Sequence, residues 1–188
     1  MAVRDQLITT TAGLMRRKGV AATSIADILE DSGVARRSIY LNFPGGKSEL
    51  VTATTMAMGE AITAAISGVM ERDDPIVAFA NMWSSMLAES DFDGGCPVLA
   101  AALGQHTAPE ATAVAVGIFG KWREVIAQRL ISDHIDPHTA GTLAATIVMT
   151  IEGAVVMSIA SKSATPLYEA ATHLNELVAL HRPPDRSR

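Results

Sequence analysis

The sequence of 188 residues is poor in cysteine, aromatic residues and charge. With Cys96 as its single cysteine, the chain cannot form an internal disulfide, which fits a reducing compartment such as the cytosol. Aromatic residues make up 4%, and no alternating apolar and polar run lies between hairpin turns, so strands are not expected. Hydrophobic residues make up 48% against 19% charged residues, a balance that excludes extended disorder.

Signals for a membrane location are also lacking. Arg4 and Asp5 lie where a signal peptide would need an apolar core. Residues 143–160 form the stretch most like a membrane span, but Glu152 lies near its middle, where a carboxylate is costly in a bilayer. We therefore expect a buried helix here, no membrane partner and a cytoplasmic location.

Patterns that would indicate an enzyme or a metal site are absent. The sequence has no glycine-rich phosphate loop, no nucleophile elbow and no HExxH motif. No histidine lies close to Cys96, which favours a structural thiol. His134 and His138 have a spacing of four, but Pro137 interrupts a helix there, and a solvated polar loop is favoured over a metal site. We expect no catalysis, no metal and no cofactor.

Charge is distributed unevenly along the chain. Residues 1–50 hold seven Lys and Arg against five Asp and Glu, a net charge of +2. Residues 51–188 hold eight against fifteen, a net charge of −7. A basic head on an acidic body is expected when only the head meets nucleic acid.

Helical periodicity and turn residues predict an all-α fold of about nine helices. Proline recurs at expected first helical turns, where its missing N–H costs nothing. The predicted helices cover about residues 2–18, 24–32, 35–42, 47–72, 75–90, 97–106, 109–131, 137–162 and 166–181. We expect a DNA-binding domain at 1–46, a second helical domain at 47–182 with helix 47–72 as connector, and a disordered tail at 183–188.

The most informative segment is 23–47, TSIADILEDSGVARRSIYLNFPGGK. Ser24 and Asp27 have the spacing of a capping box, and Gly33 permits the tight turn between two short helices. Such a pair is a helix-turn-helix, whose second helix fits the major groove of DNA. The residues spaced to pack inside it are Ile25, Ile28, Leu29, Val34 and Ile39, and those left to face outward are Arg36, Arg37, Ser38, Tyr40 and Asn42.

Over about residues 4–60 the sequence resembles the TetR family of transcriptional regulators. The residues that carry this resemblance are Gly19, Thr23, Ile28, Gly33, Val34, Ile39, Tyr40, Phe43, Lys47 and Leu50. The link at 43–47, FPGGK, is one residue longer than the commonest form, and with GGCPV at 94–98 it resembles the branch of lincomycin- and multidrug-resistance repressors. Ala35, Arg37 and Asn42 depart from the family's usual Ser, Gly, and His or Tyr, which affects the operator sequence rather than the fold.

The resemblance implies roles that the residue chemistry supports. Thr23 or Ser24 at a helix start, Tyr40 and Lys47 would meet backbone phosphates. Arg36 and Arg37 would read base edges, because arginine pairs bidentately with guanine, although each could also be a solvated surface charge. The predicted DNA-binding residues are Thr23, Ser24, Arg36, Arg37, Ser38, Tyr40, Asn42 and Lys47.

The resemblance also implies a body that dimerises and binds a small-molecule inducer. The helices at about 137–162 and 166–181 would pair with their copies, so that the homodimer binds a pseudo-palindromic operator in double-stranded DNA. Side chains that could line a pocket, although apolar residues at helical spacing are more often plain core, are Trp83, Met86, Leu87, Phe92, Cys96, Phe119, Trp122, Met149 and Glu152. Glu152 could pair across the dimer or recognise a cationic inducer.

Together these features predict a repressor that an apolar or cationic inducer releases from its operator. Inducer would move helix 47–72 as a lever, so that the two heads no longer match the operator. A helical small-molecule carrier would explain the body but not the basic head, and an activator remains an alternative to a repressor.

Overall fold

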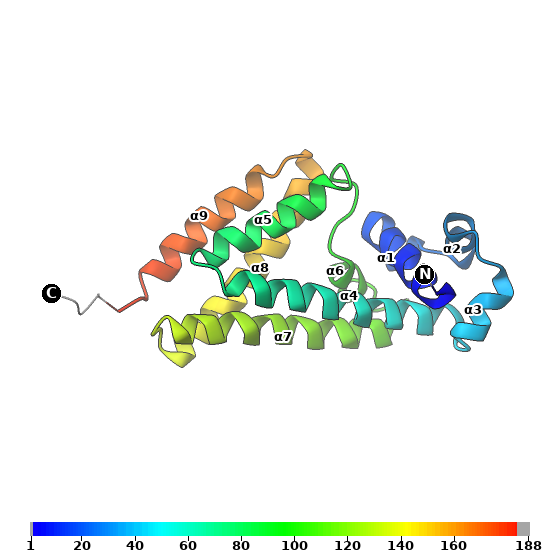
Figure 1. The fold of residues 1–188 in the computed structure, drawn as a ribbon, viewed down its shortest axis with the longest axis horizontal. Coiled ribbons are helices and arrows are strands. Elements are labelled where there is room, and N and C mark those ends of the chain that lie inside the picture. The colour runs from blue at the N-terminus through cyan, green and yellow to red at the C-terminus, as the bar shows by residue number, and fades with distance from the viewer. Residues whose placement is uncertain (1, 184–188) are drawn as a thin grey trace. The chain divides into compact units, whose positions relative to one another are not determined.

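The computed structural model describes residues 2–183, and these form nine helices and no strand, as predicted. In chain order the helices are α1 (Val3–Ala22), α2 (Ile25–Ser32), α3 (Arg36–Asn42), α4 (Gly46–Met70), α5 (Pro75–Ala88), α6 (Pro97–Ala102), α7 (Pro109–Ser132), α8 (Pro137–Ser161) and α9 (Thr165–Ala179) (Figure 1). Beyond residue 183, the tail predicted to be disordered lies outside the described residues.

Proline and capping residues explain most of the helix starts. Pro75, Pro97 and Pro137 occupy the first turns of α5, α6 and α8, where a missing N–H breaks no helical bond. The Asp136 carboxylate caps α8 by accepting from the N–H of Thr139 at 3.0 Å. This hydrogen bond lowers the pKa of Asp136, because it stabilises the charged form.

Two helix ends, those of α1 and α6, differ from the predicted ones by about four residues. α1 continues to Ala22, but Gly19 has φ 76° and ψ 169°, so the predicted break is a kink inside the helix. α6 ends at Ala102 rather than near 106, because the chain turns at Gly104, whose N–H donates to the Ala101 carbonyl at 2.9 Å.

The chain forms two compact units. The first, called here the head unit, holds the described residues up to Ile62 together with Asp93–Ile118. The second, called the body unit, holds Thr63–Phe92 and the residues from Phe119 onward. α4 and α7 each contribute residues to both, so the head unit contains more chain than residues 1–46 alone.

The head unit has a core made by α1, α2, α3 and the start of α4. Ile28 and Ile39 are fully buried, and Ile25, Leu29 and Val34 pack against them, as predicted for a helix-turn-helix. The other buried members of this core are Leu7, Ile8, Leu14, Phe43 and Leu50. These contacts fix α3 against α1 and α2 through its inner side.

The body unit is built around α5, α8 and α9, which pack against one another. Trp83 and Leu87 of α5 are fully buried, as is Leu167 of α9, and Ile151 lies on the buried side of α8. In the same unit, Arg129 of α7 donates to the main-chain oxygens of Met70, the last residue of α4, and of Arg72.

Two of the described helices, α4 and α8, are long and apolar enough to cross a membrane by length and composition. The core helix of a water-soluble protein passes the same test. Half of the most apolar stretch of α8 is buried inside the fold, and 39% of that of α4. This burial favours the predicted core helix at 143–160.

Candidate nucleic-acid interface

The first helix of the helix-turn-helix, α2, is fixed by a capping box at its start and by a glycine at its end. Ser24 Oγ accepts from the N–H of Asp27 at 3.1 Å, and the Asp27 carboxylate accepts from the N–H of Ser24 at 2.7 Å. Asp27 also pairs with Lys18 of α1 at 3.0 Å. At the other end, Gly33 adopts φ 66°, a left-handed conformation that suits glycine, and closes the turn toward α3.

The hydrogen bonds of the capping box also determine the charge of Asp27. The bonds from the hydroxyl and the N–H of Ser24, followed by Lys18, hold the pKa of this carboxyl well below its usual range. Asp27 is therefore ionised throughout the physiological pH range, and its charge stabilises the N-terminus of α2.

α3 presents a polar face with the chemistry needed to contact DNA. Arg36 and Arg37 are exposed, and Tyr40, one turn further on, is 45% exposed. Ser38 and Asn42 are half-buried, and the Asn42 amide donates to the Ser38 carbonyl at 2.8 Å. Two arginines and a phenol on one free face can bind phosphate and read base edges.

The Tyr40 ring packs over the turn that joins α3 to α4. Gly46 there has φ 67°, and a Cβ at this position would lie 3.4 Å from the ring's Cε1. Phe43, which follows α3, is buried, and the Arg4 guanidinium lies 5.1 Å from its ring centroid. The glycine-containing link therefore positions the hydroxyl-bearing ring of Tyr40.

The three other predicted phosphate contacts lie in different environments. Thr23 is fully buried and its hydroxyl donates to the Gly19 carbonyl at 2.7 Å, so its side chain does not reach the surface. Ser24 is exposed at the start of α2. Lys47 is half-buried, and its ammonium donates to the Val20 carbonyl at 3.2 Å.

Leu41 was missed by sequence reasoning. Its side chain is 68% exposed, although it is a large apolar residue on α3. The spacing of four from Arg37 is the signal that would have placed both on one helix face.

A second missed feature joins the segment before α6 to α1 within the head unit. The Arg16 guanidinium donates to the carbonyl of Gly95 at 2.8 Å and to that of Gly94 at 3.1 Å. The N–H of Gly95 donates back to the Arg16 carbonyl at 3.1 Å. The two glycines of the GGCPV segment, noted in the sequence for a family resemblance, therefore also dock the segment on α1.

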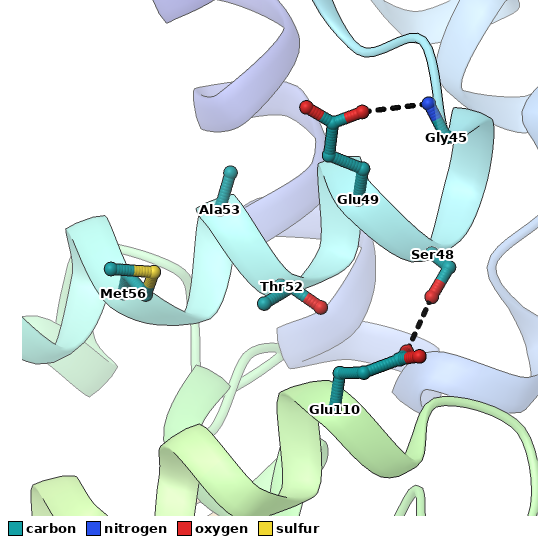
Figure 2. Close-up of a pocket in the computed structure, with 7 residues that line it drawn as sticks. All are labelled: Gly45, Ser48, Glu49, Thr52, Ala53, Met56 and Glu110. Carbon is teal, nitrogen blue, oxygen red and sulfur yellow. Dashed lines mark hydrogen bonds between the residues drawn. The ribbon is translucent and has the colours of Figure 1, made fainter.

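A surface hollow of about 590 Å³ lies in the head unit along the first turns of α4. The Glu49 carboxylate accepts a hydrogen bond from the N–H of Gly45 at 2.7 Å, and the Ser48 hydroxyl donates to Glu110 of α7 at 2.7 Å. Figure 2 shows both hydrogen bonds. Thr52, Ala53 and Met56 line the rest. None of the predicted inducer-binding residues lines this hollow, and its two carboxylates make it unsuitable for a phosphate.

The predicted inducer-binding residues are spread over both units. Cys96 belongs to the head unit, where its sulfur caps α6 by accepting from the N–H of Leu99. The others belong to the body unit, where Trp83 and Leu87 are fully buried, Met86 and Phe92 are half-buried, and Met149 is exposed on α8.

Two of these candidates form an aromatic pair in the body unit. Phe119 and Trp122 meet edge to face with centroids 5.1 Å apart. The Trp122 indole donates to the Thr63 hydroxyl at 2.8 Å. Glu152 is 7% exposed, so it is buried on α8.

His134 lies in the turn before α8 and His138 in the first turn of α8, and the nearby carboxylates form ion pairs and a helix cap. Asp133 pairs with Arg129 at 3.1 Å and with Arg182 at 2.8 Å, while Asp136 caps α8. No group of three potential metal ligands occurs among residues 2–183.

An all-helical chain whose helix-turn-helix exposes arginines on its second helix defines a DNA-binding transcriptional regulator. The model for bacterial regulatory proteins of the TetR family matches residues 7–54, and the model for the C-terminal domain of LmrA/YxaF-like transcriptional regulators matches residues 74–173. The chain belongs to the TetR family of transcriptional regulators, which are not enzymes.

Relatives agree with this assignment over nearly the whole chain. An HTH-type transcriptional regulator of Mycobacterium tuberculosis is 32% identical, covering 98% of both chains. The HTH-type transcriptional regulator LmrA of Bacillus subtilis is 26% identical, covering 93% of this chain and 96% of its own. The crystal structure of a TetR regulatory protein from Rhodobacter sphaeroides has the same fold, with a TM-score of 0.84 at 18% identity over 92% of this chain and 96% of that one.

Proposed function

We propose that this protein is a cytoplasmic, ligand-responsive repressor that binds a pseudo-palindromic operator as a homodimer. The observation that carries the proposal is the free face of α3, where Arg36, Arg37 and Tyr40 lie exposed on a helix whose inner side is fixed by the head core. TetR-family membership supports DNA as the partner of this face.

In the proposed complex, some contacts read the base sequence and others anchor the protein on the phosphate backbone. Arg36 and Arg37 pair with base edges in the major groove, with Ser38 and Asn42 beside them. Tyr40, Ser24 and Lys47 meet phosphates, which set the register but carry no sequence information. Because the Thr23 side chain is buried, we leave it out of this contact set.

The proposed dimer forms through α8 and α9. One side of α8 is apolar and open to solvent, with Met149, Val156 and Met157 exposed. A Cβ at Gly153, on the same side, would meet no neighbouring atom, so another helix could approach closely there. Pairing with a second copy would cover this face and set two recognition helices about 34–36 Å apart, one turn of DNA.

The proposed inducer binds in the body unit. The Trp83 indole N–H is fully buried and has no hydrogen-bond partner within residues 2–183. Since buried indoles usually find an acceptor, an inducer carrying one would gain a directed bond beside its apolar contacts. Glu152 has two candidate roles, a partner across the dimer or the recognition of a cationic group.

The proposed switch is a shift between two populations. Inducer favours a body conformation that moves α4, a helix that has residues in both the head unit and the body unit. A coupling of about 3 kcal/mol lowers operator affinity more than a hundredfold.

The proposal is tested by genomic selection of duplex fragments with the purified full-length protein, followed by gel-shift titration with an inducer library and cell extracts. We expect enriched pseudo-palindromes and at least one compound that releases them. Binding that no compound changes would contradict the switch and indicate a constitutive regulator. Run-off transcription from the selected promoter separates repression from activation.

A further inference from the structure

Leu41 is the most exposed large apolar side chain of the helix-turn-helix segment, residues 23–47. It is 68% exposed, while Ile39 beside it is fully buried in the head core. A single exposed leucine needs no explanation on an ordinary surface. Its position matters here because the same short helix carries the arginines proposed to enter DNA.

α3 is short enough to lie in the groove over its whole length. Its seven residues, Arg36–Asn42, span roughly 10 Å, less than the width of about 12 Å of the major groove. Arg37 and Leu41 are four residues apart, so they lie one above the other on one helix face. A groove that receives Arg37 therefore also receives Leu41.

The floor of the major groove offers one apolar feature, the 5-methyl group of thymine. The other base edges present hydrogen-bond donors and acceptors, which a leucine would desolvate without replacing. We infer that Leu41 is a specificity-determining residue that recognises a thymine methyl group in each half of the operator. This inference rests on the proposed function, because it requires α3 to lie in the major groove.

The spacing on the helix also limits where this thymine lies. One helical turn rises about 5.4 Å, and successive base pairs are about 3.4 Å apart. The thymine read by Leu41 therefore lies one to two base pairs from the guanine read by Arg37, on either strand.

The test uses the duplex that the full-length protein selects from random sequence. Each thymine is replaced in turn by uracil, which pairs identically and lacks only the methyl group, and the Kd is measured for the wild type and for Leu41→Ala. At one thymine in each half-site we expect the wild type to bind about fourfold more weakly, and about fifteenfold when both are replaced. Leu41→Ala should bind the thymine duplex more weakly and respond to neither replacement.

Leu103→Ala is the matched control, since Leu103 is 80% exposed in the same head unit but lies after α6. It should keep the wild-type response to uracil. The inference is overturned if the half-sites contain no fixed thymine near the guanine, if the wild type tolerates every uracil, or if Leu41→Ala responds as the wild type does. The uracil series on the wild type decides the question even if Leu41→Ala does not fold. A wild type that selects no duplex at all would instead refute the proposed function.

Discussion

At the residue scale, Arg37 carries the most direct prediction about sequence reading. Arg37→Ala should weaken operator binding by about 1–3 kcal/mol, roughly fivefold to more than a hundredfold, because a bidentate contact with guanine is lost. The loss should vanish on duplexes in which that guanine is changed, a pattern measured by fluorescence anisotropy on single-base variants of the operator.

Arg123→Ala is the control for Arg37→Ala, because Arg123 is exposed on the body-unit part of α7. It removes the same charge and should leave both affinity and base preference unchanged. An equal loss on all duplex sequences after Arg37→Ala would mean that Arg37 contacts phosphate rather than bases.

Asp27 gives a pH prediction at the same scale. Its pKa is lowered in the folded state, so the stability that its charge supplies is present above about pH 4, the unfolded value, and is lost as the pH falls toward the folded pKa. Ser24→Ala removes the largest cause of this shift and should cost about 1 kcal/mol near pH 7.

Urea unfolding of wild type and Ser24→Ala at pH 7 and pH 3 measures this effect. The difference in stability between the two proteins should shrink at the lower pH. A difference that is the same at both pH values would contradict the assigned role of the capping box.

At the element scale, the close approach of α4 and α7 in the head unit predicts the effect of filling a glycine. A Cβ at Gly59 would lie 2.2 Å from Cδ1 of Ile118, so Gly59→Ala should destabilise the protein by about 1–3 kcal/mol through overpacking. Gly68→Ala on the same helix meets no atom within 4 Å and should instead stabilise by about 0.5–1 kcal/mol.

Thermal and urea unfolding of the two glycine variants measures this contrast. Adding Ile118→Ala should recover part of the stability of Gly59→Ala. Two variants with equal stability would show that α4 and α7 do not pack closely at this level.

Helix positions in this chain could be read from sequence because local signals determine them. Ser24 and Gly33 delimit α2, and proline marks the starts of α5, α6 and α8, so the starts of these elements were predicted within about one residue. The docking of Gly94 and Gly95 on Arg16 was not predictable, since it depends on residues almost eighty positions apart.

The same distinction between local signals and long-range contacts applies to the candidate site. The outward side of α3 could be inferred once Ile39 was assigned to the core, because helix periodicity leaves Arg36, Arg37 and Tyr40 on the other side. The burial of Thr23 was missed, because its hydroxyl bonds to a main-chain carbonyl of the preceding helix, which residue type alone does not reveal. Inducer-binding residues are the hardest to predict and stay a prediction, since pocket and core use the same apolar side chains.

At the scale of the whole molecule, the exposed face of α8 predicts a dimer. Sedimentation at micromolar concentration should give twice the 19.8 kDa chain mass, about 40 kDa. Met157→Glu, at a side chain that is 63% exposed, should produce monomers, because a charge would be buried in the apolar interface.

Met56→Glu on α4 is the matched control for the dimer, since Met56 is 50% exposed in the head unit. It should remain dimeric. A dimeric Met157→Glu would place the interface elsewhere, and a monomeric wild type would remove the basis for a pseudo-palindromic operator.

The central claim is that the helix-turn-helix presents the exposed face of α3 to a duplex. The measurement that tests it most directly is the affinity of the purified protein for its selected operator and for random DNA between about 50 and 200 mM salt. We expect a preference for the operator of at least about a thousandfold and a steep weakening of binding as salt rises. Equal affinity for both duplexes at every salt concentration would contradict the account.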